Sequence, residues 1–389
     1  MQQHRMNTTQ KRRDGYIPSL DGWRAIAVFG VLFNHSLTWN IRGHSLRPLQ
    51  DVGGLGVVLF FAISGFLITT RIVQEERSCG RFDLMGFYIR RFYRIQPAAL
   101  LYLCTVAVLM IAGAIHCEWH FWVAALMMYQ NFAFRGISVD PQSFFVGHFW
   151  TLAVEEHFYI FLSLILFVVR RYRLSALCFL YLLFSALQRH HASYIATHSW
   201  VIRRTWWQLQ YLLFPSMLAL ALIRPRVRVF AQRWVRPYSV VLVWGLIILC
   251  HRLELHLRHR DKPFLKGSQM LDEVGFFPEV ICTLIIIATA LHERSWVTRL
   301  LESPLLKWVG KISYSLYLWH VLFFFRLAPE LHITNPVLNA ISGSGPKIIA
   351  SFIAAALSYY LVEKPLMRKG HQLAPPASPG RPELIEVVR

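Results

Sequence analysis

Residues 16–36 read YIPSLDGWRAIAVFGVLFNHS, and this stretch decides how the rest of the chain is interpreted. It is mostly apolar and predicts a helix, yet it carries Asp21, Arg24 and His35. Arg24 and His35 are eleven residues apart, so both fall on one helix face, about 16 Å apart along the axis. An ionised arginine within a bilayer is costly and usually marks a functional site. The plainer alternative is that Asp21 and Arg24 pair at the interface and only anchor the helix.

The composition indicates an integral membrane protein. Of 389 residues, 55% are hydrophobic and only 16% are charged, whereas about a quarter of the residues of a soluble domain are charged. Several apolar runs approach or exceed the roughly 20 residues that a helix needs to cross a bilayer. We therefore predict an all-α, polytopic membrane protein.

The formal net charge of +20 does not indicate a nucleic-acid partner, because the basic residues cluster at the ends of apolar segments. This pattern is typical of cytoplasmic loops, and it also suits membrane lipids or an anionic cofactor that arrives from the cytoplasm. The six cysteines are scattered, with no CxxC or Cys/His spacing. The sequence thus predicts neither a metal site nor a disulfide framework.

We expect about ten transmembrane helices with the N- and C-termini in the cytoplasm. Residues 1–15 would be a cytoplasmic tail, 16–368 the membrane domain, and 369–389 a cytoplasmic tail expected to be disordered. The segment His120–Phe134 is short for a span and would be re-entrant or lie at the outer surface. The spans are expected near 20–39, 52–70, 98–115, from 148, 174–187, 206–223, 240–250, 276–291, from 310, and 348–361.

An arginine-rich stretch follows the second span and ends in FYIRRFYRIQP, residues 87–97. Arg91 and Arg94 are three residues apart, and Arg90 and Arg94 are four apart, so they share a helix face. Arginines in any cytoplasmic loop help to fix the topology of a membrane protein. Taken alone, these residues favour this anchoring role. The alternative is a phosphate-binding patch, because guanidinium groups match phosphate oxygens.

The fourth span begins HFWTLAVEEHFY at residue 148, and arginines follow its far end. Glu155 and Glu156 would then lie about 10 Å below the outer surface. A carboxylate inside the membrane needs a partner. His35 is expected at a similar depth, which makes it a candidate partner for Glu155.

Polar residues also mark the ninth and second spans. The ninth begins GKISYSLYLWH at residue 310, and its polar face either lines a cavity or forms hydrogen bonds between helices. Ser64, beside Gly65, either allows close helix packing or breaks the second span next to a cavity. The candidate cavity or acceptor residues are Ser64, Tyr314, Tyr317 and His320.

Six motifs occur in a fixed order: SLDGWRAIAVFGVLFNH, FFAISGFLIT, FYIRRFYRIQP, FWTLAVEEHFY, GKISYSLYLWH and LVEKP. Taken together they resemble the bacterial integral-membrane acyltransferase 3 family over about residues 16–368. The resemblance implies ten helices in the bacterial cytoplasmic membrane. It also implies transfer of an acyl group, most often acetyl, from acyl-coenzyme A to a hydroxyl, usually on a cell-surface or exported glycan.

The resemblance also assigns roles to residues. It places the family's Arg-x10-His pair on Arg24 and His35, the coenzyme A-gripping RxxR on Arg91 and Arg94, and the buried acid on Glu155. One ring nitrogen of His35 would remove the proton of the acceptor hydroxyl. The other ring nitrogen of His35 would be hydrogen-bonded to Glu155. The competing route is an acetyl-histidine relay.

Two other functions remain open from the sequence. The acceptor could be a small lipophilic compound such as a macrolide, as for stand-alone members of the family that this chain resembles. A transporter or flippase of lipid-linked glycans is the alternative of another class, because buried arginine, histidine and glutamate also suit a proton relay. The inverted repeats expected in many transporters are not visible in the sequence.

Overall fold

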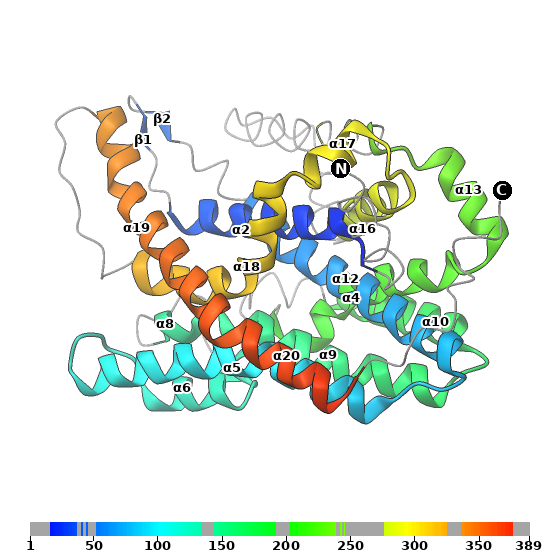
Figure 1. Ribbon diagram of the computed structural model, residues 1–389, viewed down its shortest axis with the longest axis horizontal. Coiled ribbons are helices and arrows are strands. Elements are labelled where there is room, and N and C mark those ends of the chain that lie inside the picture. The colour runs from blue at the N-terminus through cyan, green and yellow to red at the C-terminus, as the bar shows by residue number, and fades with distance from the viewer. Residues whose placement is uncertain are drawn as a thin grey trace.

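The computed structural model describes residues 16–36, 40–41, 44–45, 52–133, 143–191, 203–238, 242, 245, 276–324 and 336–375. Within these ranges the regular structure is almost entirely helical, which confirms the all-α prediction (Figure 1). The exception is a small antiparallel pair, β1 (Asn40–Ile41) with β2 (His44–Ser45).

Five helices and one π-helix line the cavity described below. These are α2 (Pro18–Ser36), α4 (Val52–Cys79), α5 (Leu84–Ile111), α9 (Phe149–Val168), α18 (Pro304–Leu322) and η4 (Tyr359–Glu363). The surrounding helices are α6 (Trp119–Leu126), α7 (Gln130–Ala133), α8 (Phe144–Gly147), α10 (Arg173–His190), α12 (Thr205–Ala221), α13 (Pro225–Trp234), α16 (Phe276–Leu291), α17 (Trp296–Leu301), α19 (Pro336–Ser358) and α20 (Lys364–Leu373).

Four helical stretches in the described part of the chain are long and apolar enough to cross a membrane: Gly54–Cys79, Leu84–Ile111, Phe144–Val168 and Gly345–Leu373. A fifth is possible if α12 and α13, which are bent by 111° at their junction, count as one span. The ten-span topology and the cytoplasmic side of the termini stay predictions. The predicted span at 240–250 lies almost wholly outside the described residues.

Three boundaries differ from the prediction. The arginine stretch is not a loop before the third span, because α5 is continuous from Leu84 through Pro97 to Ile111. The segment predicted at 120–134 forms two short helices, α6 and α7, which are separated by a turn in which Met128 has a φ of 54°. The last helix, α20, continues to Leu373, past residue 368, where the membrane domain was expected to end.

Close backbone packing places α2 in the middle of the molecule, against α4 and α18 (Figure 1). A Cβ atom on Gly310 of α18 would overlap the carbonyl group of Asp21, and one on Gly56 of α4 would press on Ala27. Small residues at such crossings let membrane helices approach closely. Gly56 therefore has a packing role in the second predicted span.

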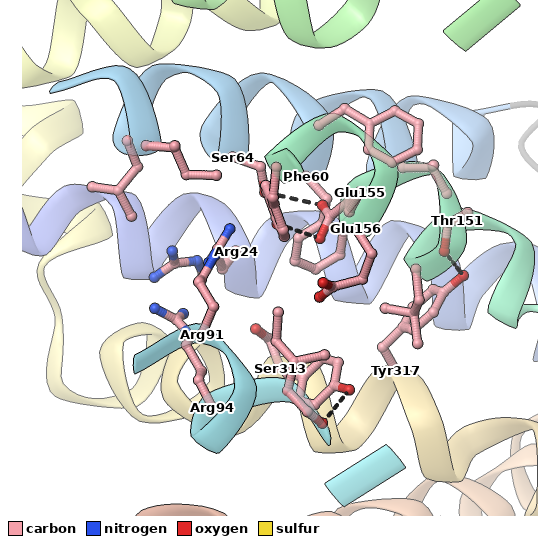
Figure 2. A pocket seen from close by; sticks show the side chains of 18 of the residues that line it. Arg24, Phe60, Ser64, Arg91, Arg94, Thr151, Glu155, Glu156, Ser313 and Tyr317 are labelled. Carbon is pink, nitrogen blue, oxygen red and sulfur yellow. Dashed lines mark hydrogen bonds between the residues drawn. The ribbon is translucent and has the colours of Figure 1, made fainter. Parts of the chain in front are cut away.

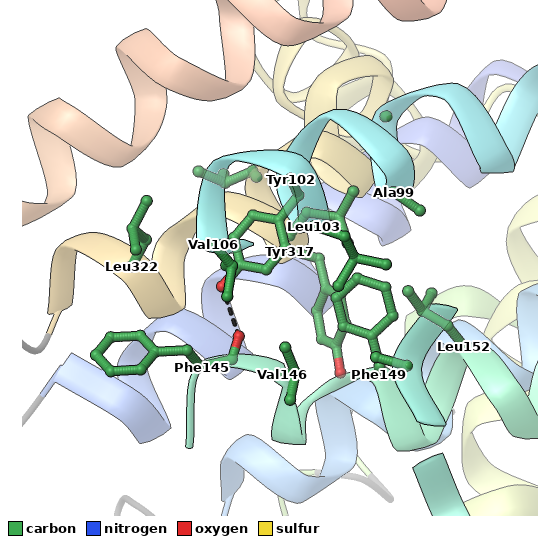
Figure 3. Close-up of a cluster of buried hydrophobic side chains, with 14 of the residues drawn as sticks. Ala99, Tyr102, Leu103, Val106, Phe145, Val146, Phe149, Leu152, Tyr317 and Leu322 are labelled. Carbon is green, nitrogen blue, oxygen red and sulfur yellow. Dashed lines mark hydrogen bonds between the residues drawn. The ribbon is translucent and has the colours of Figure 1, made fainter. Parts of the chain in front are cut away.

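An apolar core supports the neighbouring region of α18. Figure 3 shows side chains of α5, α8 and α9 gathered beside Tyr317, with Tyr102 and Phe149 fully buried. Tyr102 satisfies its buried hydroxyl by donating to the carbonyl oxygen of Phe145 at 2.7 Å. This core holds Tyr317 in place from one side.

The crossing of α2 and α18 gives a test of the packing. We expect Gly310→Ala to destabilise the protein by roughly 1–3 kcal/mol, because its methyl group has no room and the helices must separate. Gly54→Ala is the matched control, since nothing lies within 4 Å of a Cβ atom there. Thermal unfolding in detergent measures both, and equal melting temperatures would contradict the packing.

Candidate active site

A cavity of about 110 Å³ lies between α2, α4, α5, α9, α18 and η4. It brings together several residues that the sequence had singled out from distant segments: Arg24, Ser64, Arg91, Arg94, Glu155, Tyr314 and Tyr317. It also contains Ser313 of the polar face predicted for the ninth span, and polar residues to which the sequence analysis gave no role: Thr151, Glu156, Tyr159, Lys311 and Glu363. Polar residues from six elements therefore meet in a chain whose interior is otherwise largely apolar.

Three guanidinium groups gather at one end of the cavity, where Figure 2 shows Arg24, Arg91 and Arg94 close together. The Arg91 guanidinium lies over the ring of Tyr159, 3.5 Å from its centroid. Its Nε and Nη2 atoms are buried and have no hydrogen-bond partner among the described residues. Buried donors without partners are costly. This end of the cavity is therefore suited to an anion with several acceptor oxygens.

Arg24 is held at this end by an acidic neighbour. Its Nη1 atom donates to Asp21 Oδ1 at 3.0 Å, and Tyr16 donates to the other carboxylate oxygen of Asp21. Burial, reinforced by the charge of Asp21, raises the pKa of Tyr16, so the phenol keeps its proton at neutral pH. The plainer interpretation is thus correct in that Asp21 and Arg24 form an ion pair. Arg24 nevertheless also lines the cavity.

Arg90 does not join the other arginines. Its guanidinium donates to Glu75 Oε2 at 2.8 Å and to the carbonyl oxygen of Ala374 at 3.3 Å. These contacts join α5 to α4 and to the residue that follows α20. Arg90 is absent from the cavity lining, so its grouping with Arg91 and Arg94 as a ligand-binding residue does not match the structure.

The two oxygens of Glu155 are both occupied. Ser64 Oγ donates to Oε1 at 2.9 Å, and Tyr159 Oη donates to Oε2 at 2.7 Å. The predicted contact between Glu155 and His35 is therefore wrong. Matching the depth of two residues did not show which neighbouring helix each side chain faces. Ser64 and Tyr159 are the partners that the buried carboxylate required.

His35 instead belongs to a cluster of histidines beyond the other end of the cavity. Its ring packs edge-on against the ring of His320, with the centroids 5.1 Å apart, and the His320 ring lies 5.9 Å from that of His148. His320 is fully buried, whereas His35 is exposed. Neither His35 nor His320 lines the cavity.

Tyr317 connects the cavity to this cluster. It lines the cavity, and its ring centroid lies 5.7 Å from that of His320. Its hydroxyl donates to the carbonyl oxygen of His148 at 3.0 Å and lies 2.7 Å from Thr151 Oγ1 (Figure 2). Of the polar face predicted on α18, Ser313 and Tyr317 thus line the cavity, while His320 packs beyond it.

Two residues that the sequence analysis passed over had a recognisable signal. Glu363 is the acid of the LVEKP motif, and the π-helix η4 buries it where it accepts a hydrogen bond from Ser315 at 2.8 Å. Tyr159 lies one helical turn after Glu155, close enough on the same face to donate to it. Within the described ranges, no group of three histidine, cysteine or acidic residues could hold a metal ion.

Comparisons with known proteins show which family the chain belongs to. The family model described as an acyltransferase domain matches residues 17–360, so the chain belongs to the acyltransferase 3 family of membrane-embedded acyltransferases. No solved structure matches the chain.

The relatives carry names of O-acetyltransferases. One is O-acetyltransferase OatA of Staphylococcus aureus (strain NCTC 8325 / PS 47), 29% identical over 91% of this chain and 58% of that protein. Another, from Bacillus subtilis (strain 168), is provisionally named peptidoglycan O-acetyltransferase YrhL and is 30% identical over 93% of this chain and 56% of its own length. The chain therefore spans less than two thirds of the length of these relatives.

The Arg90–Glu75 pair gives a test that separates a structural arginine from a ligand-binding one. Arg90→Gln should lower the free energy of unfolding by about 1–3 kcal/mol, because a mostly buried carboxylate loses its charged donor. A double-mutant cycle with Glu75→Gln, followed by thermal unfolding in detergent, measures the coupling. Strictly additive effects of the two substitutions would contradict the pairing.

Proposed function

We propose that this protein is an O-acyltransferase that moves an acetyl group from cytoplasmic acetyl-coenzyme A to a hydroxyl of a cell-surface or exported glycan. The observation that supports it best is the cavity itself, with three arginines at one end and Tyr317, which contacts the histidine cluster, at the other. The O-acetyltransferase relatives support the reaction, and the name of the Bacillus subtilis relative supports a glycan acceptor. In this proposal the chain crosses the bacterial cytoplasmic membrane ten times, with both termini in the cytoplasm.

The donor would enter from the arginine end. Coenzyme A is too polar and anionic to enter the bilayer, so its phosphates would stay at the mouth with Arg91, Arg94 and Arg24. The cavity, at about 110 Å³, is smaller than the roughly 300–1,000 Å³ of pockets that enclose a whole ligand. It therefore suits the thin pantetheine arm and its acyl end, with the nucleotide remaining outside.

Acyl transfer would take place at His35. Its imidazole would accept the proton of the sugar hydroxyl while the hydroxyl oxygen attacks the thioester carbonyl and the thiolate of coenzyme A leaves. In the competing route the imidazole attacks first and carries the acetyl group to the acceptor. His35 is exposed, as a group that meets an acceptor must be. Because His35 lies outside the cavity lining, either route requires the acyl end to pass Tyr317.

Glu155 has a different proposed role from the one expected of the buried acid. Through Tyr159 it fixes the ring on which the Arg91 guanidinium lies. It would therefore be a positioning residue for donor binding, and His35 would act without a carboxylate partner. Ser64 also donates a hydrogen bond to Glu155, so it would help to hold this carboxylate in place.

We expect His35→Ala to lower acetyl transfer by about 10²–10⁴-fold, the usual contribution of a general base. The measurement is transfer of labelled acetyl from acetyl-coenzyme A to glycan in membranes. His371→Ala, at an exposed histidine of α20, is the control. Near-normal transfer by well-expressed His35→Ala would rule out both routes.

Labelled acetyl-coenzyme A without acceptor separates the two routes. The relay predicts acetylated protein, whereas direct transfer predicts none.

The arginines should act on donor binding. Replacing Arg91 and Arg94 together by Gln should raise the KM for acetyl-coenzyme A by about tenfold or more, because lost charge-assisted hydrogen bonds to phosphate weaken the ground state and the transition state alike. Steady-state kinetics on purified protein in nanodiscs measures it. An unchanged KM combined with poor expression would instead assign these arginines to cytoplasmic anchoring.

A further inference from the structure

Two adjacent carboxylates reach the cavity, and their surroundings differ. Glu155 accepts hydrogen bonds on both oxygens. Glu156 also lines the cavity, yet it accepts no hydrogen bond from any residue in the described part of the chain. Figure 2 shows its carboxylate directed into the cavity. Glu156 is only partly exposed, and a carboxylate that faces a cavity is stabilised when hydrogen-bond donors reach it. Glu156 is therefore equipped to receive donors from a ligand.

The position of Glu156 narrows the kind of ligand group. It lies between the arginine end and the pair formed by Thr151 and Tyr317 (Figure 2). Arg91 acts on Glu156 electrostatically, but no hydrogen bond joins the two in the described part of the chain. A ligand that spans the cavity would place its anionic groups at the arginines and its reactive end near Tyr317. The part that passes Glu156 then needs hydrogen-bond donors.

The other carboxylates of the cavity do not offer the same site. Glu363 accepts from Ser315 at 2.8 Å and is almost fully buried. Glu155 accepts hydrogen bonds from Ser64 and Tyr159. Within the described cavity lining, Glu156 is thus the acid whose oxygens remain available.

We propose that Glu156 binds the pantetheine arm of the acyl donor by accepting hydrogen bonds from its amide N–H groups. This inference rests on the proposed function, because the coenzyme A donor proposed there combines phosphates with an amide-bearing thioester arm. The arginines would thus hold the nucleotide end, and Glu156 would hold the arm on its way to Tyr317. Glu156 would contact the donor without taking part in the chemical step.

Two probes separate the two binding regions. Coenzyme A carries both the phosphates and the pantetheine arm, whereas adenosine 3′,5′-bisphosphate carries phosphates and lacks the arm. Their Kd values would be measured by calorimetry on the full chain in nanodiscs, for the wild type, Glu156→Leu and Glu156→Gln. Glu118→Leu, at a half-exposed carboxylate before α6, is the matched control.

We expect Glu156→Leu to weaken coenzyme A binding by about tenfold or more, as expected for the loss of a charged hydrogen-bond acceptor. Binding of adenosine 3′,5′-bisphosphate should stay within about twofold, which also shows that the arginine end is intact in the variant. Glu156→Gln should weaken coenzyme A binding less than Glu156→Leu, because its amide oxygen still accepts a hydrogen bond.

Either of two results would overturn the inference: Glu156→Leu binds coenzyme A as well as the wild type, or it loses both probes equally. Failure of the proposed function looks different. In that case the wild-type protein binds neither probe, and the inference fails together with the donor on which it rests.

Discussion

The stack of the Arg91 guanidinium on the ring of Tyr159, at 3.5 Å, is the interaction on which the cavity depends. It places a permanent cation inside a bundle of mostly apolar helices without giving it a carboxylate partner among the described residues. The ring is fixed in turn, because Tyr159 donates to Glu155, which also accepts from Ser64 of the neighbouring helix. An aromatic face stabilises a cation but leaves its N–H groups unused. Those unused groups make this end of the cavity suited to the anion that we propose binds there.

Close packing at two glycines places α2 in the middle of the molecule. Gly310 and Gly56 let α18 and α4 come close to it, which brings Arg24 to the arginine end and His35 to the histidine cluster. One helix therefore reaches both ends of the proposed path. Tyr317 lines the cavity and its ring packs against that of His320, so in the proposed path the acyl group passes this side chain.

The sequence was sufficient to predict the helical class, the membrane-embedded family and several of the polar residues that meet in the cavity. Periodicity and depth placed Arg24, Arg91 and Glu155 at useful positions along their helices. They could not show which neighbouring helix each of those side chains faces. For this reason Glu155 was paired with His35 rather than with Ser64 and Tyr159. Residue spacing also could not show that Glu155, rather than Glu156, is hydrogen-bonded, or that Arg90, rather than Arg91 or Arg94, joins helices. Both depend on tertiary contacts.

The most direct test of the proposed path is photo-crosslinking with an acetyl-coenzyme A analogue that carries a small diazirine in the acyl group, followed by peptide mapping. Labelling should fall on α18 near Tyr317 and His320 and on the end of α2 near His35, and excess acetyl-coenzyme A should abolish it. Labelling confined to lipid-exposed helices such as α10, or unaffected by competitor, would contradict a donor path through this cavity.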